Sequence, residues 1–372
     1  MHKITFYPVG NGDSCKIDLE CGKKLLFDYA QFYQPDDDND HRIDLATALR
    51  NDLESDGRKY FDVVAFTHAD EDHIRGASEF FYLEHAEKYQ DDDRIKINEL
   101  WVPAAFIIET NLKDDARILR AEARYRLKQG KGIRVFSRPE LLVDWLESEG
   151  LTLNDRRHLI TDAGQLVPGF DASSDGVEFF VHSPFAKHVE DTMVDRNSSS
   201  LILHVTFFVG EQQTKFMLIG DTEYDVLSEI VQITRNHNRD ERLEWDIYDI
   251  PHHCSYLALS NEKGEEMTKP VEDVKWLLEQ GGEKGILVSS SWPIPSDDSD
   301  KQPPHRQAAN CYKYYASRIN GKFVVTMEHP TVSKPEPIVI EIDEFKATLK
   351  KSISFGASAI VSRPAPRAGG IR

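Results

Sequence analysis

Several features that would assign a protein to a specialised class are scarce or missing in this sequence. It has four cysteines in 372 residues, irregularly spaced and without a CxxC pair, so neither a disulfide scaffold nor a zinc ribbon is indicated. It has no run of about eighteen apolar residues, and its first ten residues lack the basic and apolar regions of a signal peptide. We therefore expect a soluble cytoplasmic protein without a membrane partner.

Positive charge is also in deficit. Asp and Glu number 64 against 45 Lys and Arg, which gives a formal net charge of -19. Such a chain disfavours general binding to nucleic acids or anionic membranes, because both need a basic surface to replace counterions. A phosphodiester substrate stays compatible with this charge, since bound divalent cations and a local basic patch can override the global sign.

The remaining composition is that of a globular protein, and 40% hydrophobic residues can bury one large core or two moderate ones. Strand-like runs alternate with amphipathic helical patterns, which favours a layered α/β domain. Between about 80 and 170 the chain is mainly charged and helix-favouring, so we predict a helical insertion there, outside the central sheet. We expect one domain over 1–345, followed by a loose tail over 346–372.

The densest group of polar side chains is the stretch THADEDH at 67–73. Directly before it, FDVVAF (61–66) has the composition of a strand buried on both faces, and the residues after it are typical of a helix. Two histidines and three carboxylates therefore lie in a loop that leaves the carboxyl end of a buried strand. Open α/β sheets tend to place their sites at such ends.

Other strand-like runs stop at side chains that bind metals. They deliver Asp221 (TKFMLIGDTE), His252 and His253 (WDIYDIPHHCS) and, after a loop, His305, while VDRNSSSLIL starts a strand at Asp195 or Asn197. Imidazole and carboxylate at several strand ends suit Zn, Mn or Fe. One Asp bridging two cations, with His/Asp sets on either side, would hold metals about 3.5 to 4 Å apart and activate a water between them.

The motifs VGNGDS, LLFDYA, THADEDH, NSSSLIL, LIGDTE, IPHHCS and PPH, in this order, resemble the metallo-β-lactamase fold superfamily. Within it they resemble the hydrolase domain of ComEC-like DNA-uptake proteins, which carries HxDxDH in place of the usual HxHxDH and an HHGS-like motif after the bridging Asp. The resemblance runs from residue 4 to about 327. It implies a four-layered αββα sandwich and a hydrolase with two divalent metal ions, Zn or Mn.

The resemblance also implies roles for individual residues. His68 and Asp70 would hold one metal. Asp72, His73 and His305 would hold the other, and Asp221 would bridge both. Asp72 would also take part in catalysis.

Further positions in the same motifs would meet the substrate. His253, or His252, would stabilise developing negative charge or protonate the leaving group. Asn197 stands where many members of the superfamily keep a third histidine, so it is expected to orient substrate. Cys254 replaces the glycine of HHGS, which changes the backbone room near the site. Outside the motifs, His204 is expected to be a packed histidine, and His182 is open between packing and lining the site.

Three functions fit these observations. The first is a binuclear hydrolase of phosphodiesters, a nuclease or nucleotide phosphodiesterase. The second keeps the metals and cleaves a lactone, thioester or amide in a small molecule. The third is a non-catalytic metal-binding assembly subunit that works through the insertion, by self-association or with a partner protein. Basic residues at the cleft would distinguish the first two, and the sequence-adjacent candidates are Arg75, Arg196, Lys301 and Arg306.

Overall fold

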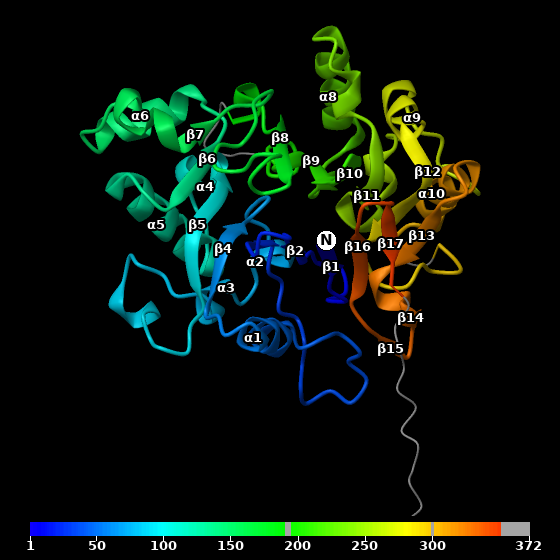
Figure 1. Ribbon diagram of the computed structural model, residues 1–372, viewed down its shortest axis with the longest axis horizontal. Coiled ribbons are helices and arrows are strands. Elements are labelled where there is room, and N and C mark those ends of the chain that lie inside the picture. The colour runs from blue at the N-terminus through cyan, green and yellow to red at the C-terminus, as the bar shows by residue number, and fades with distance from the viewer. Residues whose placement is uncertain (190–194, 299–300, 351–372) are drawn as a thin grey trace, which may run out of the picture.

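The computed structural model describes residues 1–189, 195–298 and 301–350. Two β-sheets lie face to face, and helices cover the outer face of each sheet (Figure 1). In the described part of the chain, no helix combines the length and apolar character that crossing a membrane requires.

The first sheet has nine strands in the order β17-β16-β1-β2-β3-β4-β5-β6-β7. Its strands are β1 (His2–Phe6), β2 (Cys15–Asp18), β3 (Lys24–Phe27), β4 (Tyr60–Ala65), β5 (Lys96–Pro103), β6 (Ile133–Phe136), β7 (Ile160–Thr161), β16 (Ile338–Ile342) and β17 (Ala347–Leu349). The pairs from β17 to β3 are antiparallel, and those from β3 to β7 are parallel.

The second sheet has six strands in the order β13-β12-β11-β10-β9-β8. They are β8 (Val177–Ser183), β9 (Ile202–Val209), β10 (Gln212–Ile219), β11 (Trp245–Ile250), β12 (Gly281–Ser289) and β13 (Lys322–Val325). The strands from β10 to β13 are parallel, so their carboxyl ends lie at one edge. A small ribbon pairs β14 (Pro330–Thr331) with β15 (Lys334–Pro335).

The helices divide between the two sheets. Those near the first sheet are α1 (Leu45–Ser55), α2 (Glu71–Ile74), α3 (Ala77–Phe80), α4 (Ala105–Ile108), α5 (Asp114–Gln129), α6 (Glu140–Ser148) and α7 (Leu153–Arg156). Those on the second sheet are α8 (Tyr224–Asn236), α9 (Glu272–Leu278) and α10 (Arg306–Arg318). Short 3-10 turns are η1 (Glu87–Tyr89), η2 (Arg157–Leu159), η3 (Ala186–Val189), η4 (Asp240–Arg242), η5 (His252–Cys254), η6 (Tyr256–Ala258) and η7 (Thr326–Glu328).

Alternation along the strands produces three apolar layers. In β4, Val64 faces outward into the layer with α1 and α5, whereas Val63 faces inward between the two sheets. In β12, Leu287 faces outward into the layer with α8, α9 and α10, and Val288 faces inward. Successive side chains of a strand point to opposite faces, so a strand covered on both sides is apolar throughout. The predicted α/β class and its four αββα layers are confirmed.

The prediction for residues 80–170 is wrong in one respect. The segment contains the helices α4 to α7, but it also contains β5, β6 and β7, which extend the first sheet as parallel strands. The sequence hides these strands because the first half of KINELWVP is polar and IRVF is too short to show a period. The segment therefore continues the sheet and is not a helical insertion outside it.

The predicted tail also differs at its start. Residues 347–349 form β17, which pairs with β16 at the edge of the first sheet. The rest of the predicted tail, 351–372, lies outside the described residues.

Two histidines inside the second sheet are packed rather than placed at the strand ends. His182 in β8 donates from Nε2 to the carbonyl of Arg242 at 2.8 Å, and His204 in β9 donates from Nε2 to the carbonyl of Glu244 at 2.9 Å. Burial lowers the pKa of His182 to about 4 and holds the pKa of His204 well below its usual range. The packed interpretation is confirmed for His204 and settles the choice for His182.

These two histidines predict a specific pH dependence of stability. Histidines in the unfolded chain bind protons below about pH 6.5, whereas His182 and His204 stay neutral in the fold, so unfolding takes up protons. The free energy of unfolding is therefore unaffected by these two histidines above that pH. Below it, the free energy of unfolding falls by about 1.4 kcal/mol per pH unit for each histidine. Urea unfolding in EDTA between pH 7.5 and 5 measures this slope.

The matched comparison is the double variant His182→Gln/His204→Gln. We expect it to lose this part of the slope, whatever its stability at pH 7.5. Equal slopes in the two proteins would contradict the assignment.

Candidate metal centre

Four strand ends, two from each sheet, meet at one place in the molecule. Asp28 follows β3, and the THADEDH stretch follows β4, its parallel neighbour. Asp221 follows β10. The turn Pro251–Cys254, called the PHHC turn below, follows β11, which is the parallel neighbour of β10. The carboxyl ends of parallel neighbours share an edge, so each sheet brings two polar loops to the same side.

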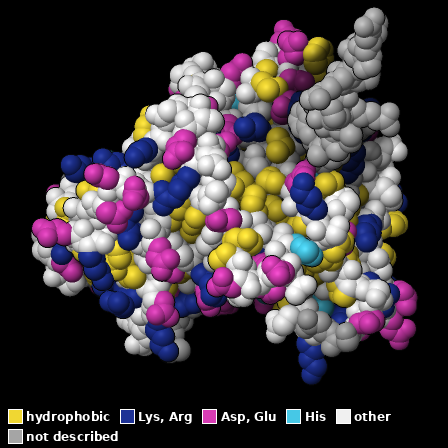
Figure 2. All heavy atoms as spheres, turned by 90° about the horizontal axis from the view of Figure 1, so that it is seen from below, with side chains coloured by type: hydrophobic (Ala, Val, Ile, Leu, Met, Phe, Trp, Pro, Cys, Tyr) yellow, Lys and Arg dark blue, Asp and Glu magenta, His cyan; other side chains and the backbone are white. Residues whose placement is uncertain are grey.

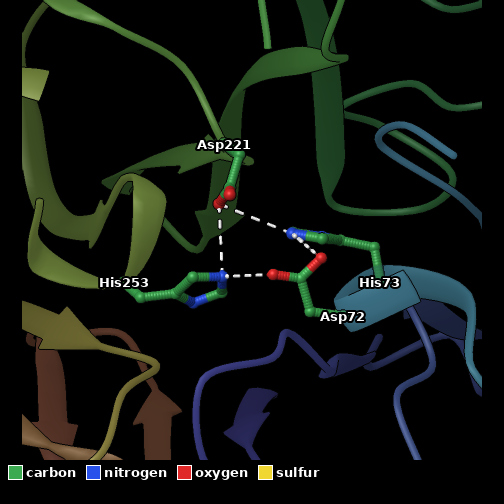
Figure 3. A group of neighbouring side chains, drawn as sticks. All are labelled: Asp72, His73, Asp221 and His253. Atoms are coloured by element: carbon green, nitrogen blue, oxygen red, sulfur yellow. Dashed lines mark hydrogen bonds and ion pairs between the residues drawn. The ribbon is translucent and has the colours of Figure 1, made fainter. Parts of the chain in front are cut away.

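The centre of this place is a group of four side chains that point toward one another (Figure 3). Asp72 and His73 come from α2, Asp221 from the end of β10, and His253 from η5. His73 Nε2 lies 3.4 Å from Asp221 Oδ1, and His253 Nε2 lies 3.1 Å from Asp72 Oδ2 and 3.6 Å from Asp221 Oδ1. The ligand atoms that the four residues offer all lie within 4.8 Å of one another.

This group fits a divalent cation. Within the described chain, His73 Nε2 and Asp221 Oδ1 are buried and have no hydrogen-bond partner. Buried polar atoms are nearly always satisfied, so two such atoms facing each other need an explanation. Two imidazoles and two carboxylates around one point are a donor set that suits Zn or Mn.

The electrostatics of the group couple cation binding to proton release. Burial lowers the pKa of His253, but the carboxylates of Asp221 and Asp72 outweigh burial and raise the pKa to about 10. For Asp221, burial raises the pKa, and His253 and His73 hold it well below its usual range. The histidines must therefore give up protons when a cation binds, and affinity should increase with pH.

Asp28 fixes the orientation of His73. Its carboxylate accepts hydrogen bonds from the Thr67 backbone N–H and Thr67 Oγ1, both at 2.7 Å, and from His73 Nδ1 at 2.8 Å. A proton held on Nδ1 makes Nε2, which is turned toward Asp221, the nitrogen that releases its proton when a cation binds, as in carboxylate–histidine–metal triads. The sequence places Asp28 at the end of a strand, in LLFDYA, but does not assign it this role.

Asp28→Asn is expected to weaken divalent-cation binding by roughly 10- to 100-fold, because the amide can present its N–H₂ to His73 and no longer holds the proton on Nδ1. Competition against a chromophoric chelator measures the affinity. Asp246→Asn is the matched control, since Asp246 also accepts a backbone hydrogen bond, from Lys215, but lies at the start of β11 in the second sheet. Equal affinities in wild type and Asp28→Asn would show that Asp28 does not orient the ligand.

The PHHC turn places its two histidines by unusual backbone geometry. His252, His253 and Cys254 have φ angles of 52°, 51° and 65°, three successive residues in the left-handed region. This region is costly for residues with a Cβ, and strained backbone of this kind gathers at functional sites. The Cys254 position, where the resembling motif has glycine, therefore does adopt a conformation that glycine favours.

His252 lies at the rim of the group. Its Nε2 is 3.8 Å from Asp221 Oδ2, and its side chain is 20% exposed, against 3% for His253. His252 is thus the more accessible histidine of the pair, and His253 is the one inside the group.

His68 and Asp70 lie on the other side of His73. The rings of His68 and His73 are 3.9 Å apart, and His68 Nε2 is 3.5 Å from Asp70 Oδ2. Asp70 also forms an ion pair with Arg196. Burial raises the pKa of Asp70, but His68 and Arg196 outweigh it and hold the pKa below its usual range.

The structure groups the predicted ligands differently from the sequence. Among the described residues, the two groups able to hold a metal are Asp72, His73, Asp221 and His253, and Asp13, Asp28 and His73; neither includes His305. His305 Nε2 donates to the Lys301 carbonyl at 3.2 Å, and its Nδ1 accepts from the Tyr256 N–H at 3.4 Å. His253 therefore stands beside Asp72 and His73, where His305 was expected. Metal binding by His305 stays a prediction.

Asn197 lies in the turn before β9, half-buried, and its carbonyl accepts from the Ser200 N–H at 3.5 Å. Substrate contact by its side chain stays a prediction.

A cleft of about 690 Å³ opens beside Asp70. Two of the four basic candidates, Arg75 and Arg196, line it together with Lys113. The acidic lining residues are Glu71, Glu79, Asp114 and Asp115. Arg306 instead pairs with Glu266 and Asp298.

Two residues near the group were not predicted. Asp13, from the GNGDS motif, has Oδ2 at 3.7 Å from His73 Nδ1 and Oδ1 at 4.0 Å from His253 Nδ1. The available signal was its position between the turn Gly10-Asn11-Gly12 and the strand β2. Glu109 pairs with Arg196 and comes from the segment predicted as an insertion, where no motif marks it.

No protein-family model matches the sequence, and no curated protein sequence does. Several solved structures have a similar chain path. A diphosphatase of the PhnP family is 10% identical, covers 94% of this chain and 100% of its own, with a TM-score of 0.36. A putative metal-dependent hydrolase from Parabacteroides distasonis is 12% identical, with coverage of 86% and 92% and a TM-score of 0.33. A metallo-β-lactamase bound to 2-mercaptoethanesulfonate is 11% identical, with coverage of 66% and 78% and a TM-score of 0.30.

Proposed function

We propose that this chain is a metal-dependent hydrolase that cleaves phosphodiesters, as a phosphodiesterase or nuclease. The observation that carries the proposal is the convergence of Asp72, His73, Asp221 and His253, in which His73 Nε2 and Asp221 Oδ1 are buried without a hydrogen-bond partner. The arginines of the adjoining cleft favour an anionic substrate, because guanidinium groups match phosphate in charge and in hydrogen-bond geometry.

A divalent cation held by this group would polarise a phosphoryl oxygen and lower the pKa of water. The chain's own residues would position the substrate and protonate its leaving oxygen. Asp28 and the Ser290 carbonyl, which accepts from His253 Nδ1 at 2.8 Å, fix the two imidazoles. His252, at the rim, would give a proton to the leaving oxygen. Arg196 would bind a nonbridging oxygen.

Metal content and phosphodiester turnover test this proposal together. Elemental mass spectrometry on protein purified without added metal, read beside Mn-dependent hydrolysis of bis-p-nitrophenyl phosphate, should show bound cation and turnover. DNA, RNA and cyclic nucleotides would then be compared as substrates. Protein that neither contains nor acquires Mn or Zn, or that is loaded and inactive on all of these, would refute the proposal.

A second function has its own supporting observation. Four carboxylates line the cleft, and acidic side chains are interspersed with basic ones on the face shown in Figure 2. With a net charge of -19, the protein would attract an anionic substrate less than an uncharged one, so this cleft suits a small uncharged substrate such as a lactone, thioester or amide. If the protein hydrolyses a lactone, thioester or amide faster than it hydrolyses bis-p-nitrophenyl phosphate, the small-molecule hydrolase is favoured.

A further inference from the structure

Arg196 brings a permanent positive charge to the predicted metal ligands. It lies in the turn before β9, and its Nη1 forms an ion pair with Asp70 Oδ1. Its Nε and Nη2 donate to Glu109 Oε1 at 2.9 Å and 2.7 Å. The guanidinium thus bridges two carboxylates from different loops of the first sheet.

Glu109 makes this placement rigid. It ends α4, which follows β5, and it is 6% exposed. Arg120 in α5 holds the Glu109 carbonyl by a hydrogen bond of 2.5 Å. A planar guanidinium gripped through two of its nitrogens by a fixed carboxylate keeps one orientation. The third nitrogen, Nη1, then points at Asp70.

The two predicted cation positions are unequal in this structure. Around Asp221, four side chains offer ligand atoms that lie within 4.8 Å of one another, and two of these atoms, His73 Nε2 and Asp221 Oδ1, are buried without a hydrogen-bond partner. At the other position His68 Nε2 is likewise buried without a hydrogen-bond partner, but no group of three or more ligands among the described residues includes His68 or Asp70. Asn197 stands in place of a further histidine, and Asp70 already has a cationic partner. A divalent cation bound through Asp70 would share this carboxylate with the guanidinium, and like charges close together in a partly buried place repel each other.

We propose that Arg196 takes the place of a second metal ion: one divalent cation binds at Asp72, His73, Asp221 and His253, and the guanidinium on Asp70 supplies the second positive charge. Arg196 has five N–H donors, and its three contacts to Asp70 and Glu109 leave two that no other contact among the described residues uses, so these two could meet a substrate oxygen. The substrate part of this inference rests on the proposed phosphodiesterase function. The stoichiometry part does not.

The first test counts cations. Tag-free protein is stripped with EDTA, loaded with Mn²⁺ or Zn²⁺, desalted and measured by elemental mass spectrometry, with calorimetric titration as a second count. We expect one cation per chain, still one in Asp70→Asn, and none in Asp72→Asn. Two cations in the wild type, none at all, or loss of the cation in Asp70→Asn would each overturn the proposal.

The second test removes the guanidinium. Arg196→Ala should keep one cation per chain and lose at least 100-fold in phosphodiester kcat/KM, with partial recovery on adding free guanidinium. Arg75→Ala is the matched control, because Arg75 lines the same cleft but pairs with Glu71. Unchanged turnover in Arg196→Ala, or loss without recovery, would contradict the role of the guanidinium. Absence of turnover in the loaded wild type would instead refute the proposed function. The number of cations per chain would then be the test of this inference.

Discussion

Asp221→Asn is expected to weaken divalent-cation binding by more than about 100-fold and to abolish phosphodiester turnover. The reason is its central position: Asp221 Oδ1 faces both His73 Nε2 and His253 Nε2, and Oδ2 faces His252. Partners that only orient a ligand already contribute roughly 10- to 100-fold to metal affinity, so a direct ligand should exceed that. Calorimetric titration with Mn²⁺ and hydrolysis of bis-p-nitrophenyl phosphate measure the two effects.

Asparagine keeps the size and shape of the side chain, so loss of binding would report the missing charge rather than a cavity. Asp246→Asn again serves as the control for a general effect of removing a carboxylate from the second sheet. Normal hydrolysis by Asp221→Asn would exclude Asp221 as a ligand.

The histidines of the PHHC turn should separate cation binding from turnover. His253→Ala is expected to lose the cation, because its Nε2 lies inside the ligand group. His252→Ala should change the cation affinity by no more than about a few fold. Its kcat should fall by roughly 10²- to 10⁴-fold, the range for loss of a general acid. Metal content and kcat, measured on the same preparations, distinguish the two.

His305→Ala completes this comparison. The sequence alone assigned His305 to the cation and His253 to the substrate, whereas the structure surrounds His253 with ligands and turns His305 toward Lys301 and Tyr256. We therefore expect His305→Ala to retain its cation. If His305→Ala loses the cation and His253→Ala keeps it, the assignment from the sequence is correct and the grouping described above is wrong.

The layered fold was predictable because burial on both faces leaves a clear pattern. Runs such as VVAF (63–66) and FMLI (216–219) are apolar throughout, and a strand that is covered on both faces requires that. The strands β5 to β7 escaped because their apolar part is shorter than a pattern needs.

The part of the site that lies directly after strands was predictable from the sequence. THADEDH and Asp221 each follow an apolar run, and parallel pairing brings them together. The choice between His253 and His305 depends on three left-handed residues at 252–254, and side-chain types do not reveal backbone angles. Glu109 was out of reach for another reason: its partner Arg196 is distant in sequence, and one glutamate among many charged residues has no pattern.

The position of β1 has a consequence for how the chain is made. β1 pairs with β2 on one side and with β16 (Ile338–Ile342) on the other. During translation, β1 therefore leaves the ribosome long before the strand that covers its second edge. An uncovered strand edge is a template for wrong pairing, so the nascent chain should depend on chaperones until β16 emerges. The ligands come from both sheets, so the cation can be held by all four only after β10 and β11 of the second sheet have formed.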